Sequence, residues 1–147
     1  MPIKDNTNYD AINQRIIQAT ATIEDMAIRK LAICGEECIN IARNYHNYTD
    51  QTGNLTSSIG YVIVKDGEVI VQSSFEVVKD GKLGSSQGKF YSKELAKYFP
   101  QYLTLIVVAG MHYATYVADK GYNVIQSAEL LADTIVPNML KKLGLKI

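Results

Sequence analysis

The chain has no tryptophan, only two cysteines among its 147 residues, and no long hydrophobic run. No segment approaches the roughly 20 consecutive apolar residues that a membrane-spanning helix needs. The N-terminus also lacks the apolar run of a signal peptide. We therefore expect a protein that is made in the cytoplasm and has no membrane partner.

An excess of charge is also missing, because 15 lysine and arginine residues balance 15 aspartate and glutamate residues. A strong positive field is what lets a protein capture nucleic acid without regard to sequence. The balance disfavours a dedicated DNA-binding protein. If DNA passes nearby, a nearly neutral surface would let it slide without being trapped, which fits a conduit better than an anchor.

No catalytic motif stands out, and two partial matches fail on inspection. Gly84–Lys89 resembles a phosphate-binding loop, but only three residues separate its glycines and Phe90 follows the lysine, where the motif needs four residues and then Ser or Thr. Cys34 and Cys38 lie one helical turn apart, and buried cysteines acting as small hydrophobic residues are favoured over a metal clip. We predict no enzyme activity, no cofactor and no metal.

A long helix is predicted from about Tyr9 to Tyr45, because apolar residues recur there at steps of three and four. This stripe consists of Ile12, Ile16, Ala19, Ile23, Met26, Cys34, Cys38, Ile41 and Tyr45. The register falters at Lys30 and Leu31, and a glycine inside a helix costs about 1 kcal/mol, so a bend there or a break at Gly35 are both open. We favour one long, slightly interrupted helix.

Three strands follow from runs rich in Val, Ile and Tyr. Ser58–Lys65 and Glu68–Ser73 flank Asp66-Gly67, the dipeptide that suits a two-residue hairpin. Leu103–Ala109 is apolar on both faces and is predicted as a central strand. The hairpin is apolar on both faces too, so one face can pack on the long helix. The other face needs a second cover, either the C-terminal helix or a neighbouring subunit.

Residues 76–101 are predicted as a polar arm. Its first part is rich in glycine, serine and lysine, and Phe90–Phe99 is predicted as a short helix ended by Pro100. A long irregular loop inside a compact domain is usually functional or disordered. The arm is mildly basic and could face DNA or a partner ring, while a plain solvated loop is the competing interpretation. The lysines that would face DNA or a partner ring are Lys79, Lys82, Lys89 and Lys93.

The C-terminal third is predicted to contain a short helical segment at Tyr113–Asp119 and a final helix from Ser127 to about Leu143. Pro137 should kink or break this helix near Val136. The whole chain, 1–147, is thus predicted as one α+β domain. Its three- to four-stranded antiparallel sheet would pack against a long N-terminal helix and a C-terminal helix, with a long polar loop inserted.

Short motifs in the middle and last thirds of the chain resemble one protein family. They are Thr52-Gly53-Asn54-Leu55, Ser58-Ile59, Val108-Ala109-Gly110, Tyr113-Ala114, Tyr116-Val117 and Gly121-Tyr122. In this combination they look like the head–tail joining, or tail-completion, proteins of long-tailed double-stranded DNA bacteriophages. One departure is the polar stretch 76–101, which stands where many members have a shorter connection.

The resemblance implies a structural virion protein at the neck of the phage, made in the host cytoplasm. Copies would form a homo-oligomeric ring around the DNA channel, between a portal or adaptor protein and a tail-tube or tail-terminator protein. DNA would pass through without sequence-specific binding. The alternative is a small ligand- or peptide-binding regulatory module, in which the polar arm folds over its ligand.

The ten tyrosines, in a chain without tryptophan, suit a contact surface, with core packing as an equal alternative. We place Tyr113, Tyr116 and Tyr122 near the surface between subunits, together with Leu55 and Ile59, which would also anchor the hairpin. The glycines expected to allow tight turns are Gly53, Gly67 and Gly110.

Overall fold

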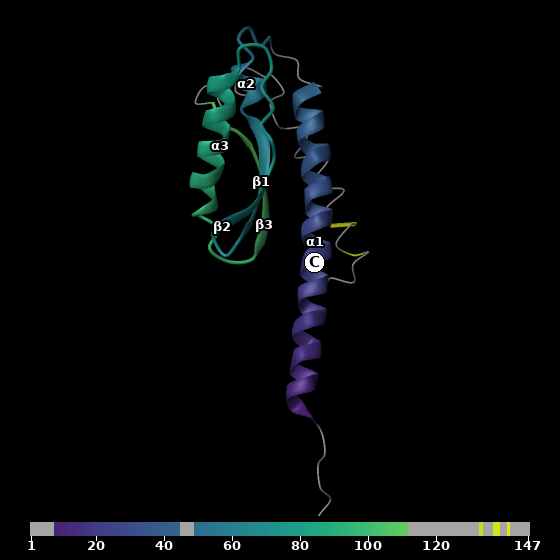
Figure 1. The fold of residues 1–147 in the computed structure, drawn as a ribbon. Helices are drawn as coiled ribbons and strands as arrows, with labels where there is room; N and C mark the ends of the chain where they lie inside the picture. Colours follow the sequence, from purple (N-terminus) through teal and green to yellow (C-terminus); the bar gives the residue numbers. More distant parts are fainter. Residues whose placement is uncertain (1–7, 45–48, 112–132, 134–136, 139–140, 142–147) are drawn as a thin grey trace, which may run out of the picture.

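The computed structural model describes residues 8–44 and 49–111, and beyond these only positions 133, 137, 138 and 141. The elements in chain order are α1 (Tyr9–Asn44), α2 (Asn54–Ser57), β1 (Ile59–Lys65), β2 (Glu68–Gln72), α3 (Lys82–Ala96) and β3 (Leu103–Ala109). The strands form one antiparallel sheet in the order β2-β1-β3. Helices α1 and α3 lie on either side of it (Figure 1), which confirms the predicted α+β class. None of the helices described here is long and apolar enough to span a membrane.

The hairpin is the element that follows most directly from local sequence. Asp66 and Gly67 both have positive φ, 53° and 82°, as a two-residue turn of this kind requires. Lys65 and Glu68 pair directly across the turn. The third strand covers the predicted Leu103–Ala109, but its predicted central place was wrong. Of the three strands β1 is the central one, since β2 and β3 both pair with it.

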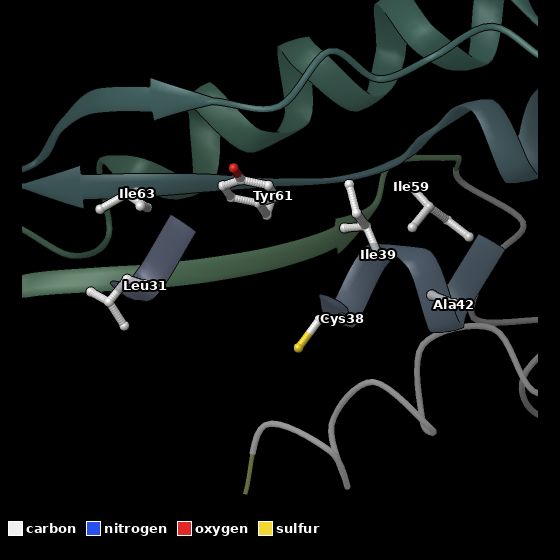
Figure 2. Packing of buried hydrophobic residues seen from close by; sticks show 7 residues of the cluster. All are labelled: Leu31, Cys38, Ile39, Ala42, Ile59, Tyr61 and Ile63. Carbon is white, nitrogen blue, oxygen red and sulfur yellow. The ribbon is translucent and has the colours of Figure 1, made fainter. Parts of the chain in front are cut away.

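The two faces of β1 are covered by two different helices. Ile59, Tyr61 and Ile63 pack against α1 (Figure 2). The α1 residues in this cluster are Leu31, Cys38, Ile39 and Ala42. On the opposite face, Val62 and Val64 pack against Ala96 of α3. The sequence predicted that this face would be covered by the C-terminal helix or by a neighbouring subunit. It is covered by α3.

Helix α3 corrects the prediction of a polar arm at 76–101 and of a short helix at Phe90–Phe99. Its buried face consists of small residues, namely Gly84, Ser85, Gly88, Ser92 and Ala96. A Cβ at Gly88 would lie 2.6 Å from the carbonyl oxygen of Ser58 and from the Phe75 ring. Glycine is thus needed there because the helix approaches the β1 layer so closely.

Helix α1 runs for 36 residues and does not break at Gly35. A Cβ on Gly35 would lie 2.7 Å from the Tyr61 ring, so the glycine makes room for the tyrosine. The Tyr61 hydroxyl donates a hydrogen bond of 3.1 Å to the Glu36 carboxylate. An ion pair between Lys65 and Glu24 adds a contact at the hairpin end of β1. The glycine that sequence alone marks as a helix breaker is therefore a packing residue.

The two halves of α1 differ sharply in burial. All of its buried residues lie between Ala27 and Ala42, whereas residues 9–26 contain none. In Figure 1 this first half extends away from the sheet and α3. The predictions for residues 113–119 and 127–143, with the kink near Val136, lie outside the described residues.

Candidate functional site

The Thr52-Gly53-Asn54-Leu55 motif forms a structural junction at the end of α1. The Asp50 carboxylate accepts hydrogen bonds from the backbone N–H groups of Gly53, at 3.1 Å, and Thr56, at 2.7 Å. Gly53 has φ +78°, and a Cβ there would lie 2.0 Å from the Val78 carbonyl oxygen. The turn that begins α2 therefore requires this glycine, as predicted for Gly53.

The polar side chains that follow in the motif bind backbone groups. The Ser57 hydroxyl accepts a hydrogen bond from the Val78 N–H at 2.8 Å, and the Ser58 hydroxyl donates one to the Leu55 carbonyl at 2.6 Å. The Asn54 side-chain oxygen accepts from the N–H of Gly84 in α3, at 3.0 Å. These contacts join α2, the segment before α3 and the start of α3, so the motif holds the fold together here.

Two cations complete the junction. The Arg43 guanidinium donates to the carbonyl oxygens of Ile59, at 3.3 Å, and Glu76, at 2.7 Å. The Lys79 ammonium donates to the Asp50 carbonyl at 2.6 Å. A cavity of about 260 Å³ lies against these groups. Lys79, predicted to face DNA or a partner, is thus bound into the junction.

The two cysteines are 1% exposed each. Burial raises the pKa of the Cys34 thiol, and the nearby Glu37 charge raises it further. Burial also raises the pKa of the Cys38 thiol, to which Cys34 and Glu37 add. Both side chains are therefore protonated at neutral pH and are poor nucleophiles. Among the described residues, no three His, Cys, Asp or Glu side chains gather as metal ligands would.

A row of exposed apolar residues runs along the first half of α1 and on to Ile33, and we call it the outer stripe. It consists of Tyr9, Ile12, Ile16, Ala19, Ile23, Met26 and Ile33. Each of the large side chains among them is at least 42% exposed. The steps alternate between three and four residues, with Lys30 standing between the last two members. That alternation is the heptad spacing with which helices pack against other helices in coiled coils.

The outer stripe is distinct from the side of α1 that packs on the sheet. Residues such as Leu31, Ile39 and Ala42 contact β1, and they lie on another side of the helix from Ile23 and Met26. Soluble chains tolerate scattered exposed apolar residues, but a contiguous apolar row marks an interaction site. Most of this row was predicted from the sequence as an apolar stripe along one side of the long helix, without a surface that would cover it.

A second exposed surface lies on α3 and gathers three of the four predicted lysines. Lys82, Lys89 and Lys93 are all exposed, beside Leu83 at 55% and Phe90 at 67% exposure. The buried small residues occupy the adjacent side of this helix, which faces the sheet. We call the five exposed residues the basic face. Sequence reasoning named the lysines but missed the helix that aligns them.

The structure places four of the other predicted site residues, and three lie outside the described residues. Leu55 and Ile59 are 2% and 0% exposed within the single chain, so their predicted place between subunits was wrong. Gly67 has the positive φ of its turn. At Gly110 a Cβ would lie 2.5 Å from the Gly88 Cα, which makes close packing between the β3 end and α3 its role. The three remaining residues, Tyr113, Tyr116 and Tyr122, lie outside the described residues.

Comparisons with protein-family models, with curated proteins and with solved structures found no match for this chain.

Proposed function

We propose that this chain is a structural virion protein of a tailed double-stranded DNA phage. Copies assemble into a homo-oligomeric ring at the head–tail junction, where a neck, connector or tail-completion protein joins the portal side to the tail. The ring surrounds the DNA channel and binds a portal or adaptor protein on one side and a tail-tube or tail-terminator protein on the other. Its work is mechanical, and binding energy takes the place of catalysis.

The observation that carries this proposal is the outer stripe of α1. Five large apolar side chains are exposed at heptad spacing on residues 9–26 of α1, which contain no buried residue, and Ile33 continues the row beyond them. The two faces of the sheet, by contrast, are covered by the chain's own helices. Apolar surface for assembly is therefore supplied by α1, with the stripe of one copy packing against another copy.

Magnitudes favour an assembly that depends on concentration. Complete burial of a large apolar side chain is worth about 1.5–3 kcal/mol, so covering the remaining half of six such side chains gives roughly 5–9 kcal/mol. Association costs about 4–15 kcal/mol in lost translational and rotational freedom. The outer stripe alone therefore gives weak pairing, and a closed ring gains from having two interfaces per copy.

The resemblance in the Thr52–Ile59 and Val108–Gly110 motifs supports the particular site in the virion. The regulatory alternative depended on a polar arm that folds over a ligand. Residues 82–96 are instead a helix packed on the sheet, so that alternative loses the segment it relied on.

The test compares two neighbouring residues of α1 that differ in position relative to the outer stripe. Ile16 is in the stripe and 59% exposed, whereas Ile17 is off it and 66% exposed. We expect sedimentation velocity and electron microscopy to show concentration-dependent rings for the wild type and for Ile17→Asp. Ile16→Asp should remain a folded monomer, because association would bury a charge.

A wild type that stays monomeric at all concentrations, with neither portal-side nor tail-side protein able to recruit it, would refute the proposed function. Equal assembly of the Ile16→Asp and Ile17→Asp variants would remove the outer stripe from the interface.

A further inference from the structure

The basic face of α3 has a regular geometry. Lys82, Lys89 and Lys93 follow one another at steps of seven and four residues, so they lie along one line of the helix, about 10 Å and about 6 Å apart along its axis. The small residues of α3 turn a neighbouring side of the helix to the sheet, and Gly88 there has no room for a side chain. The three lysines therefore lie along the exposed margin of that packed side.

The charge on this face is not neutralised within the described part of the chain. The two ion pairs found there join Lys65 to Glu24 and Lys97 to Glu94. Residues 82–97 contain four lysines and a single acid, Glu94, in a chain whose overall charge is zero. Positive charge is thus concentrated on one outer helix of a neutral molecule.

We propose that the basic face contacts the phosphate backbone of double-stranded DNA, without reading its sequence. A line of ammonium groups is complementary to a regular row of phosphates, and lysine contacts of this kind carry no sequence information. The choice of duplex DNA as the ligand rests on the proposed function, in which DNA passes through the ring. The proposal adds which surface of each subunit faces that DNA.

An anionic membrane is a poorer fit for the same surface. Helices that lie on membranes bury a broad apolar face in the lipid. The large apolar side chains exposed on α3 are Leu83, Phe90 and Tyr91, at 55%, 67% and 46% exposure, and three such side chains do not make the broad apolar face that lipid would cover. Charge complementarity, and not apolar burial, is what this surface offers.

The contact is expected to be weak for one chain and useful in a ring. Three phosphate contacts give a slope of about −2.7 for log K against log salt, so affinity should fall about 40-fold between about 50 and about 200 mM salt. A ring presents the face many times, so DNA is held loosely by many contacts and each contact is readily exchanged.

The test measures binding of the full chain to a fluorescent duplex across this salt range. In the triple variant Lys82→Gln, Lys89→Gln and Lys93→Gln, the slope should shrink by about one for each lysine removed and approach zero. The control is the variant Arg15→Gln, Arg29→Gln and Lys30→Gln, which removes the same charge from exposed positions on α1. It should keep the wild-type slope. Circular dichroism checks that both variants are folded.

Several outcomes would overturn the inference. These are no duplex binding by the wild type, an unchanged slope in the α3 variant, or an equal loss in the α1 control, which would assign the effect to net charge. Binding to anionic phospholipid vesicles but not to duplex would also overturn it. Tighter binding to single-stranded DNA that is lost in Phe90→Ala would do the same, because it would indicate base stacking.

The inference and the proposed function can fail separately. A chain that forms rings but does not bind duplex through α3 refutes only the inference. A chain that binds duplex through α3 but remains a monomer, with no affinity for phage neck proteins, refutes the proposed function.

Discussion

The two halves of α1 have similar apolar patterns but different surroundings. Residues 27–44 supply the buried side chains that meet β1, whereas residues 9–26 carry isoleucines of the same kind that remain exposed. Ile39 is 9% exposed and Ile16 is 59% exposed. The difference teaches that helical periodicity reports that a face needs a partner, and does not report which chain supplies it.

The largest expected effect is a difference in the free energy of unfolding between two variants, each with one substitution in one half of α1. Ile39→Ala removes a core side chain and should lower the free energy of unfolding by about 2–5 kcal/mol. Ile16→Ala should change it by no more than about 0.5 kcal/mol in dilute solution, where no other copy covers the stripe. Urea unfolding of both variants measures the difference. Comparable losses would mean that the chain's own residues cover Ile16.

An intermediate effect is expected where α1 touches the sheet most closely. Gly35→Ala places a methyl group against the Tyr61 ring, at 2.7 Å, and should cost about 1–3 kcal/mol despite the better helix propensity of alanine. The control is to make the same Gly35→Ala change in the Tyr61→Ala variant. Without the ring, the change should be neutral or should stabilise the protein. A double-mutant cycle from urea unfolding measures this coupling. Stabilisation by Gly35→Ala alone would contradict the close approach.

The smallest expected effect is the dependence of stability on pH that comes from Tyr61, the residue that packs against Gly35. Burial, and then the hydrogen bond and charge of Glu36, raise the pKa of Tyr61 to about 12. The unfolded phenol ionises near its ordinary pKa of about 10, so the unfolded state holds fewer protons than the folded state between these values. Stability from this residue is therefore complete below about pH 10 and falls as pH rises toward 12.

The control for this pH dependence is Tyr61→Phe. It should lose about 1 kcal/mol at neutral pH, because a buried hydrogen bond is removed. Its unfolding free energy should then fall less steeply than that of the wild type above pH 10. Parallel decline of the two proteins would exclude Tyr61 as the source.

Much of the fold could be predicted because its signals are local. Asp66-Gly67 fixes the hairpin through its turn chemistry, and Leu103–Ala109 has the composition of a strand. Helix α3 could not be found in this way, because its buried face is made of glycine, serine and alanine and so leaves no apolar period. Its one usable signal is small residues at every fourth position, at 84, 88, 92 and 96.

The site was harder to predict than the fold for the same reason. The basic face exists only because α3 is a helix, so lysines assigned to a polar arm had no common direction. Leu55 and Ile59 were assigned to an interface because apolar residues beside a motif do not reveal burial. Whether Gly35 breaks the helix could not be decided from its neighbours in sequence. The side chain that requires a glycine there, Tyr61, lies 26 residues further along the chain.

The central claim is that another copy of the chain covers the outer stripe. Hydrogen-exchange mass spectrometry of α1, in dilute and in concentrated protein, tests it most directly. The account predicts that residues 27–44 are protected in both samples, and that residues 9–26 exchange rapidly when dilute and become protected on assembly. Equal and strong protection of both halves in the dilute monomer, or rapid exchange of residues 9–26 in the assembled state, would contradict it.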